Sequence, residues 1–456
     1  MDLSDWDYCP TEEGPSPFKL LEAIGKVMDR PWFGRTWIVQ EFVLGSKDNI
    51  IFQIGQYQLS IREFDALFNY RQKWALARGF KRRKLHVTAK EFLVVLRWSE
   101  LRSSQIMQSI VDFEYATKGK KADFTRLWSK LLYWLTTIRR TVATDSRDKI
   151  FAAFGLAGVY CQSGVQELRE LVDYNICVQE VYANLVKTMI TATKRLDILL
   201  ACSARGEQIH YSWTPDWTLR DTTIEGLLAS GQSLNRIRSQ GKFSASRDTD
   251  AVVTFSSDMK VLSVRGFVWN VVAWEWEEWN GTVDENREVV AMVSVDLMYR
   301  AMKKHEFYTT REEREEALKK IILPDAGGDI REELDPEDQS NDSEDGNTDK
   351  SKRKVVYEKF VKPSRAYLIP RLANVMWRST FFLTEKGYLV KDFSKTVKKG
   401  DLVCILLGCP VPVTLRRHVD NGEVWYEFGR GVYVEGIMHG RAMDMEGLEM
   451  MDFALR

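Results

Sequence analysis

The spacing of hydrophobic and polar positions changes from helical to strand-like near the middle of the chain. Before the middle, apolar residues recur with helical spacing over residues 17–30, 88–139 and 172–200, and each stretch predicts a helix with one buried face. The first of these helices should end before Pro31, because the residue before a proline disfavours helical geometry. Beyond His210 the apolar positions alternate with polar ones, which predicts β-strands.

Short elements follow Pro31. TWIVQEFVLG is a short apolar element that stops at Gly45, and NIIFQIGQYQLS predicts two short strands that turn near Gly55. Ser60 is then a candidate N-cap for the next helix, and Glu63 completes the spacing of a capping box.

Two groups of strands are predicted in the second half. The first is AVVTFSSDMKVLSVRGFVWNVVAW, with a turn at Ser257 and Asp258. The second comprises STFFLTEKGYLV, GDLVCILLGCPVPVTLRR and EVWYEFGRGVYVEGIM, with turns at 398–400 and 421–422. Each group alone has too few strands to cover a hydrophobic face, so we expect both to complete one small barrel or sandwich.

The segments between the two groups differ in composition. Residues 285–323 have helical spacing and predict a helical insert, whereas residues 324–354 are acidic and poor in large apolar side chains, which predicts disorder. The rest of the chain is expected to divide into an N-terminal segment 1–60, a mainly helical region 61–207, and a β-rich domain formed by 208–284 and 365–445.

Composition excludes several classes of function. With 456 residues, 44% of them hydrophobic, the chain can form more than one core, and its 65 basic residues equal its 65 acidic ones, so no overall field favours nucleic acid. The first residues are acidic where a signal peptide would be basic, and no apolar run reaches the length of a membrane span. Six scattered cysteines and five histidines show no metal-ligand spacing, so we expect a cytoplasmic protein without metal or cofactor.

The sharpest local motif is RPWFGRTWIVQEFVLG at 30–45. It resembles the last motif of the fungal heterokaryon-incompatibility (HET) domain, in which an aromatic pair, an arginine, a tryptophan and a Gln-Glu pair follow in this order. The residues that carry the resemblance are Arg30, Trp32, Phe33, Arg35, Trp37, Gln40 and Glu41.

Four later segments resemble the regions that usually follow that domain in the same family. They are TDSRDKIFAAFGLAG (144–158), VDYNICVQEVYANLVKTMI (172–190), YSWTPDW (211–217) and the strand-rich stretch 381–440. Their order and spacing carry the resemblance across most of the chain outside its linkers. The matching positions are Asp145, Arg147, Asp148, Gly155, Leu156, Trp213, Pro215, Asp216, Trp217, Gly387, Gly400, Asp401, Gly408, Pro412, Arg416, Tyr433, Gly436, Met438 and Gly440.

The resemblance implies an α+β chain: a partial TIR-like α/β remnant and a helical region, followed by a small, mostly antiparallel β domain. It also implies a role in fungal non-self recognition and programmed cell death, exerted through other proteins of an incompatibility or cell-death pathway, with neither nucleic acid nor a membrane span involved. The family's two opening motifs are not found ahead of Arg30, so we expect only the last third of the domain, within residues 1–60. If the true gene product contains that front part, the alternative is a TIR-like NAD-hydrolysing enzyme.

Glu41 is the candidate acid for such chemistry. On one continuous helix, Trp37 and Glu41 would share a face, as would Phe33 with Trp37, and a carboxylate against indole is partly desolvated, which raises its pKa. The alternative is that Glu41 pairs with Arg35 or Arg30 as a structural clamp while the tryptophans fill the core.

Other polar groups have structural interpretations. Thr144 is a candidate cap for a helix that starts at Ser146, and Asp145 and Asp148 would favour its positive end. A phosphate site is less well supported there, because Gly155 and Gly158 come too late.

His210, Ser212 and Asp216 lie together in sequence, but no nucleophile elbow accompanies them, so a hydrolase triad is rejected in favour of an aromatic-anchored turn around Pro215. Three residues without ligand spacing are assigned to the barrel: Cys404, Cys409 and His439. The basic run KSKRK at 350–354 is assigned to charge balance beside the acidic run.

Overall fold

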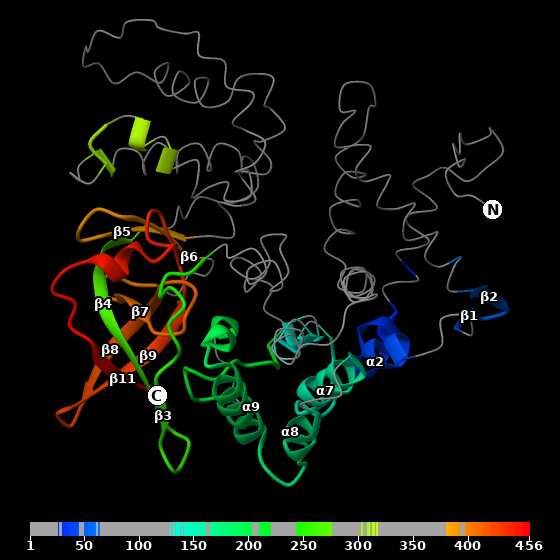
Figure 1. Ribbon diagram of the computed structural model, residues 1–456. Coiled ribbons are helices and arrows are strands. Elements are labelled where there is room, and N and C mark those ends of the chain that lie inside the picture. The colour runs from blue at the N-terminus through cyan, green and yellow to red at the C-terminus, as the bar shows by residue number, and fades with distance from the viewer. Residues whose placement is uncertain are drawn as a thin grey trace, which may run out of the picture. The chain divides into compact units, whose positions relative to one another are not determined.

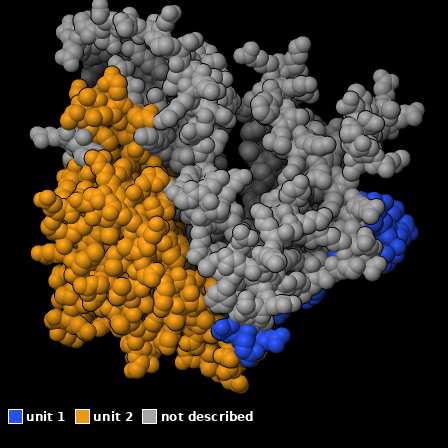
Figure 2. Space-filling model, in the orientation of Figure 1, with its two compact units in different colours: residues 1–127, 134–169 blue, residues 128–133, 170–456 orange. Residues whose placement is uncertain are grey.

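The computed structural model contains helices and mostly antiparallel strands, which confirms the α+β fold class (Figure 1). It describes residues 30–44, 50–60, 141–160, 165–202, 209–219, 243–275, 380–392 and 397–456, with Lys26, Glu63, most of 128–139 and short pieces between 302 and 317. Most of the predicted helical insert and all of the predicted disordered segment lie outside these residues. Two compact units are formed, residues 1–127 with 134–169 and residues 128–133 with 170–456 (Figure 2).

Unit 1 contains short helices and one hairpin. Its elements are the 3-10 helix η2 (Pro31–Gly34), α2 (Thr36–Leu44), β1 (Ile51–Ile54), β2 (Tyr57–Ser60), α7 (Asp148–Tyr160) and most of α8 (Val165–Glu170). β1 and β2 pair in antiparallel register around Gly55, whose φ of 61° suits glycine, and this confirms the predicted hairpin. The capping box is confirmed as well, because the Ser60 N–H donates to the Glu63 carboxylate and the Glu63 N–H donates to the Ser60 hydroxyl.

In unit 2, a helix precedes the strands. α9 (Val178–Thr193) buries Val181, Leu185 and Met189, as the predicted stripe requires, and is followed by the 3-10 helix η4 (Asp197–Ala201). The expectation of one helix over 172–200 is wrong at both ends. A turn in which Asp173 accepts the Asn175 N–H delays the start, and Lys194, at a φ of 54°, ends the helix in the left-handed conformation.

The strands of unit 2 form a closed ring. They are β3 (Val253–Phe255), β4 (Leu262–Glu275), β5 (Thr380–Thr384), β6 (Leu389–Asp392), β7 (Leu402–Leu406), β8 (Val413–Asp420), β9 (Glu423–Gly431), β10 (Tyr433–Val434) and β11 (Met451–Leu455). β4 pairs with β7, β7 with β8, β8 with β9, β9 with β11, and β11 with β4, so five strands close into a barrel (Figure 1). Among these five contacts, only that between β9 and β11 is parallel.

The barrel joins the two predicted groups of strands. β4 comes from the first group and pairs with β5 and β7 from the second, so the expectation that both groups complete one β structure is confirmed. The turn at Asn421 and Gly422 is confirmed too, with positive φ at both positions, as a two-residue hairpin turn requires.

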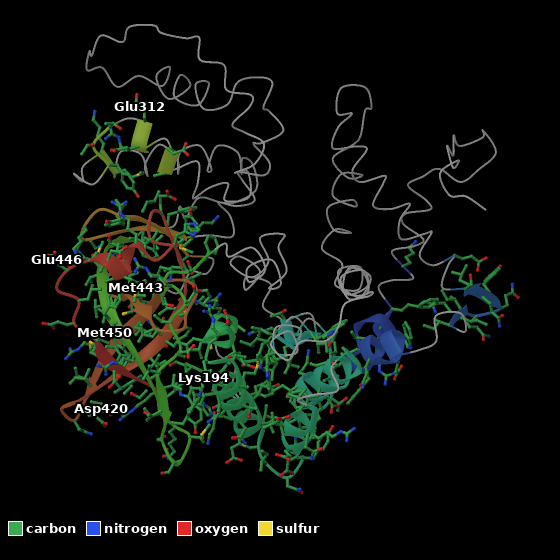
Figure 3. All side chains as sticks on the ribbon, viewed as in Figure 1. Lys194, Glu312, Asp420, Met443, Glu446 and Met450 are labelled. Carbon is green, nitrogen blue, oxygen red and sulfur yellow. The ribbon has the colours of Figure 1, made fainter. Side chains whose placement is uncertain are left out.

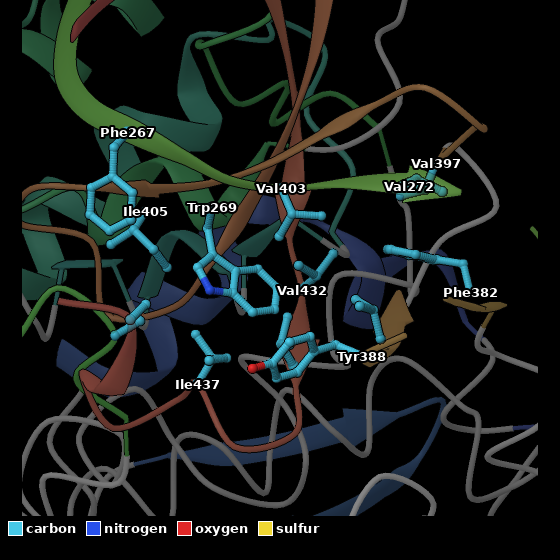
Figure 4. Close-up of a cluster of buried hydrophobic side chains, with 14 residues drawn as sticks. Phe267, Trp269, Val272, Phe382, Tyr388, Val397, Val403, Ile405, Val432 and Ile437 are labelled. Atoms are coloured by element: carbon cyan, nitrogen blue, oxygen red, sulfur yellow. The ribbon is translucent and has the colours of Figure 1, made fainter. Parts of the chain in front are cut away.

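A single hydrophobic cluster joins the strands of unit 2 (Figure 4). Trp269 from β4 meets Tyr388 edge to face, with ring centroids 4.6 Å apart, and both lie beside side chains from the other strands. The members not yet named are Ala245, Phe267, Val272, Phe382, Val390, Val397, Val403, Ile405, Val432, Val434, Ile437 and Ala442.

Candidate functional site

The HET-like motif is divided between two elements, not placed on one helix. Pro31–Gly34 is a 3-10 turn, and Arg35 follows in extended conformation with a ψ of 140° before α2 begins at Thr36. The predicted continuous helix that would place Phe33 on one face with Trp37 is therefore wrong, because Arg35 breaks it. Trp37 and Glu41 do lie one turn apart on α2.

Arg35 is extended because it forms a short parallel bridge with Val142. The Val142 N–H donates to the Gly34 carbonyl at 2.6 Å, and the Thr36 N–H donates to the Val142 carbonyl at 2.9 Å. Beside this bridge, the buried hydroxyls of Thr36 and Thr141 are 2.7 Å apart. The motif is thus attached through its backbone to the segment that leads into α7.

α2 packs against α7, and two motif pairs meet there. The Trp37 indole N–H donates to the Asp148 carboxylate at 3.2 Å. One side chain of the same helix, Gln40, lies over Gly155 so closely that a β-carbon at Gly155 would overlap its amide. The structure therefore brings Trp37 and Gln40 of the first motif to Asp148 and Gly155 of the second, and Leu156 is buried in α7 next to Gly155.

The start of α7 differs from the prediction. The helix begins at Asp148, and Asp145, not Thr144, accepts the Arg147 backbone N–H at 2.9 Å. The Arg147 guanidinium also bonds both carboxylate oxygens of Asp145, and these bonds lower the pKa of Asp145. The helix starts later because this local turn satisfies the backbone first.

Lys149 is a buried residue whose role the sequence did not indicate. Its ammonium donates to the carbonyls of Ile138, Arg139 and Thr141, and the residue is 5% exposed. These carbonyls lie at the end of a helical segment, where backbone acceptors lack partners along the helix. The only signal in the sequence is a lysine between the motif residue Asp148 and the apolar Ile150, which resembles an ordinary surface position.

Four other side chains of the HET-like motif face solvent. Arg30, Arg35 and Glu41 are exposed, and Trp32 is 41% exposed, with one edge against Phe52 at a centroid distance of 6.1 Å. Within the described residues, no ion pair joins Glu41 to Arg30 or Arg35, so the predicted clamp is not formed. The alternative prediction, a Glu41 carboxylate desolvated against indole, is not observed either, because Glu41 is exposed.

The YSWTPDW segment, in unit 2, is structural. Ser212 is buried and its hydroxyl accepts the Phe428 N–H at 2.9 Å, whereas Asp216 accepts the N–H and hydroxyl of Thr218. Ser212 and Asp216 therefore make separate local contacts, which agrees with the rejection of a hydrolase triad. Trp213 and Trp217 are fully buried around Pro215, which is also buried.

Asp401 and Arg416 are the charged motif residues of the barrel. The Arg416 guanidinium bonds both oxygens of Asp401 at 2.8 Å, and this pair ties the turn before β7 to β8. Asp401 also accepts the Lys398 N–H, which fixes the predicted turn at 398–400.

The other barrel positions of the family resemblance lie mainly in turns. Each of the glycines among them has a positive φ, and at two of them, Gly408 and Gly440, a β-carbon would overlap neighbouring atoms. Tyr433 donates to Glu435 at 2.8 Å, and burial raises its pKa. The other barrel positions of the resemblance are Gly387, Gly400, Gly436, Pro412 and Met438.

Cys404 and Cys409 are buried in the barrel, as their sequence context predicts, and burial raises the pKa of Cys409 to about 12. His439 packs against Phe243 with ring centroids 6.0 Å apart. In the described part of the chain, no three side chains among His, Cys, Asp and Glu gather as metal ligands.

Comparisons with protein-family models, with curated proteins and with solved structures found no match. Among the described residues, no helix has the length and apolar character needed to cross a bilayer.

Proposed function

We propose that this chain is a HET-type protein of fungal non-self recognition and programmed cell death, which acts in the cytoplasm through contacts with other proteins of that pathway. The segment around α2 is proposed as the end of a TIR-like domain. The observation that carries the proposal is the meeting of the HET-like motif with the second family-like motif, through Trp37 with Asp148 and Gln40 with Gly155.

That meeting divides the motif residues into two sets. One set, Trp37, Gln40, Asp148 and Gly155, makes the contacts between α2 and α7. The other set, Arg30, Trp32, Arg35 and Glu41, remains in contact with solvent. Exposed tryptophan and arginine are the residue types that most often dominate protein–protein interfaces.

The exposed set supports recognition better than catalysis. A general acid near neutral pH needs a carboxylate whose pKa is raised by burial or by a neighbouring negative charge. Glu41 is exposed on α2, so its carboxylate does not lie in such a buried setting. Arg30, Trp32 and Arg35 instead provide an aromatic anchor with two cations.

The proposal is tested by inducible expression of the chain in a filamentous fungus, with hyphal death measured by uptake of a vital dye. Wild type should kill the hyphae. The triple variant Arg30→Ala/Trp32→Ala/Arg35→Ala should accumulate to the same level and kill far less, because the changed side chains are exposed and contribute little to folding.

The matched control is Glu167→Ala/Arg169→Ala, which removes two exposed charges from α8 in the same motif-bearing half of the chain. It should kill as wild type does. Hyphae that survive expression of the wild-type chain, or a triple variant as lethal as wild type, would contradict the proposed function.

A further inference from the structure

Unit 2 has a groove between one face of α9 and the edge of β3. It holds a cavity of about 270 Å³. The groove is closed at one end where the Ala251 N–H donates to the Lys194 carbonyl at 2.8 Å, and Figure 3 labels Lys194. Its lining residues are Lys187, Ile190, Thr191 and Lys194 from the helix side and Ala251, Val253, Thr254 and Phe255 from the strand side.

The backbone of β3 presents hydrogen-bonding groups to this groove. β3 pairs with β4 in antiparallel register, with Thr254 opposite Ser263. The Arg265 N–H donates to the Val252 carbonyl and the Ser256 N–H donates to the Val261 carbonyl, so residues 252, 254 and 256 face β4. Val253 and Phe255 must then direct their N–H and C=O groups away from β4, because these groups alternate along a strand. In the described part of the chain, no other strand pairs with that edge.

The side chains around the groove are apolar at its base and cationic along its rim. Ile190 is buried, and the Phe255 ring meets Trp213 edge to face, which fixes the base. Lys187, in the second half of α9, and Lys194, the left-handed residue that follows the helix, are both exposed. Within the described residues neither lysine has an ion-pair partner.

We propose that this groove binds an extended acidic peptide segment of a partner protein. The segment adds as a strand to the free edge of β3, and its carboxylates pair with Lys187 and Lys194. A peptide fits because the unpaired N–H and C=O groups of Val253 and Phe255 match peptide backbone, whereas a nucleic acid or a free anion would use the lysines alone. Acids four residues apart in an extended segment lie about 13 Å from one another, a distance that two long, flexible lysine side chains on the rim can span. This site goes beyond the proposed function and does not depend on it.

The backbone and the lysines have different parts in binding. Strand pairing supplies affinity for any extended segment, and the two ammonium groups select acidic ones, since charge at a solvent-exposed rim contributes more to selectivity than to affinity. Peptide binding should therefore weaken when a backbone N–H of the peptide is blocked and when the salt concentration is raised.

The test uses the full chain and a fluorescein-labelled peptide, acetyl-Asp-Val-Thr-Val-Glu-amide, with binding followed by fluorescence anisotropy. Two further peptides are measured: one with lysine in place of both acids, and one N-methylated at the central threonine. We expect saturable binding of the acidic peptide, and a loss of about tenfold or more for each of the other two, a factor that corresponds to one or two lost contacts.

Protein variants separate the two contributions. Lys187→Gln/Lys194→Gln should lower the affinity for the acidic peptide by about tenfold and make this affinity less dependent on salt. Its matched control is Lys386→Gln/Lys398→Gln, which changes two exposed lysines elsewhere in unit 2 and should bind as wild type does. Val253→Pro removes the N–H that faces the groove, whereas Val253→Ala retains it, so only the proline variant should lose binding.

Three results would overturn the proposal: no saturable binding of the acidic peptide, equal binding of its N-methylated form, or equal binding to the Lys187→Gln/Lys194→Gln variant. Inorganic phosphate is added as a competitor. If it abolishes binding of both the N-methylated and the unmodified peptide, the groove binds anions in general, which would also count against strand addition. The N-methylated peptide leaves the protein unchanged, so this test holds even if Val253→Pro does not fold.

Discussion

Trp37 and Glu41 lie one turn apart on α2 and have different surroundings. The Trp37 indole bonds Asp148, whereas Glu41 is exposed. Glu41→Gln should therefore change the free energy of unfolding by less than about 0.5 kcal/mol. Trp37→Phe, which retains most of the ring and loses the N–H, should destabilise by about 1 kcal/mol. Urea denaturation of both variants measures the two values, and a larger loss for Glu41→Gln than for Trp37→Phe would contradict this assignment.

Gly155 gives a second prediction at the scale of single residues. A β-carbon there would overlap the Gln40 amide, so Gly155→Ala should destabilise the protein while Gln40 is present. In a Gln40→Ala background the overlap is absent, and alanine should then stabilise α7 by up to about 1 kcal/mol, because glycine is the poorer helix former. A double-mutant cycle by urea denaturation measures this change of sign. Additive effects in the cycle would show that the two positions do not touch.

Residue contacts could be predicted from the sequence where both partners are local. The capping box joins Ser60 to Glu63, and the hairpin turn joins Asn421 to Gly422, so spacing alone indicates each. Trp37 and Asp148 are 111 residues apart, and nothing in their spacing indicates that they meet. Lys149 was missed for a related reason, because its three carbonyl partners are backbone groups without side-chain identity.

At the scale of elements, β4 depends on Gly266. There β4 changes partner along one edge, from β3 to β7, and a β-carbon would overlap the Ile405 carbonyl and crowd Leu406. Gly266→Ala should destabilise unit 2 by about 1–3 kcal/mol, the range for overpacking. Gly34→Ala is the control, because a β-carbon there meets only a distant methyl group of Val142. Thermal melts compare the two, and an unchanged melting temperature for Gly266→Ala would refute the close β4–β7 approach.

The turn before α7 gives a pH prediction. The Arg147 guanidinium and backbone N–H lower the pKa of Asp145, so its charged form stabilises the folded chain. A lowered pKa means that this stabilisation is present above the ordinary carboxyl value and is lost as the pH falls toward the folded-state pKa. The stability difference between wild type and Asp145→Asn should therefore shrink as the pH falls through the ordinary carboxyl value near 3.8 and below it. Denaturation series across this range measure it, and a constant difference would contradict the pairing.

The ends of elements were harder to predict than their existence. The apolar stripe of α9 was correct, but Lys194 ends the helix although lysine is an ordinary helix former. Its carbonyl is bonded by Ala251, a contact that spacing within the helix does not reveal. The break at Arg35 has the same origin, since it depends on pairing with Val142.

For the whole molecule, the strands were predictable and their order was not. Alternation indicated both groups of strands, and the need to cover each hydrophobic face indicated that they combine. The ring order depends on β4, which is long enough to pair with β3 and β11 near its start and with β7 and β5 further along. Alternation marks the two faces of such a strand, but it does not say which strand lies along each edge.

In the proposed function, the chain acts by recognition through its exposed motif residues and not by catalysis at Glu41. Hyphal viability during matched expression of Glu41→Gln and of Trp32→Ala tests this most directly. We expect Glu41→Gln to kill as wild type does, since the carboxylate is exposed, and Trp32→Ala to kill much less, since it removes the aromatic anchor. Survival with Glu41→Gln together with full killing by Trp32→Ala would contradict recognition through the exposed motif residues.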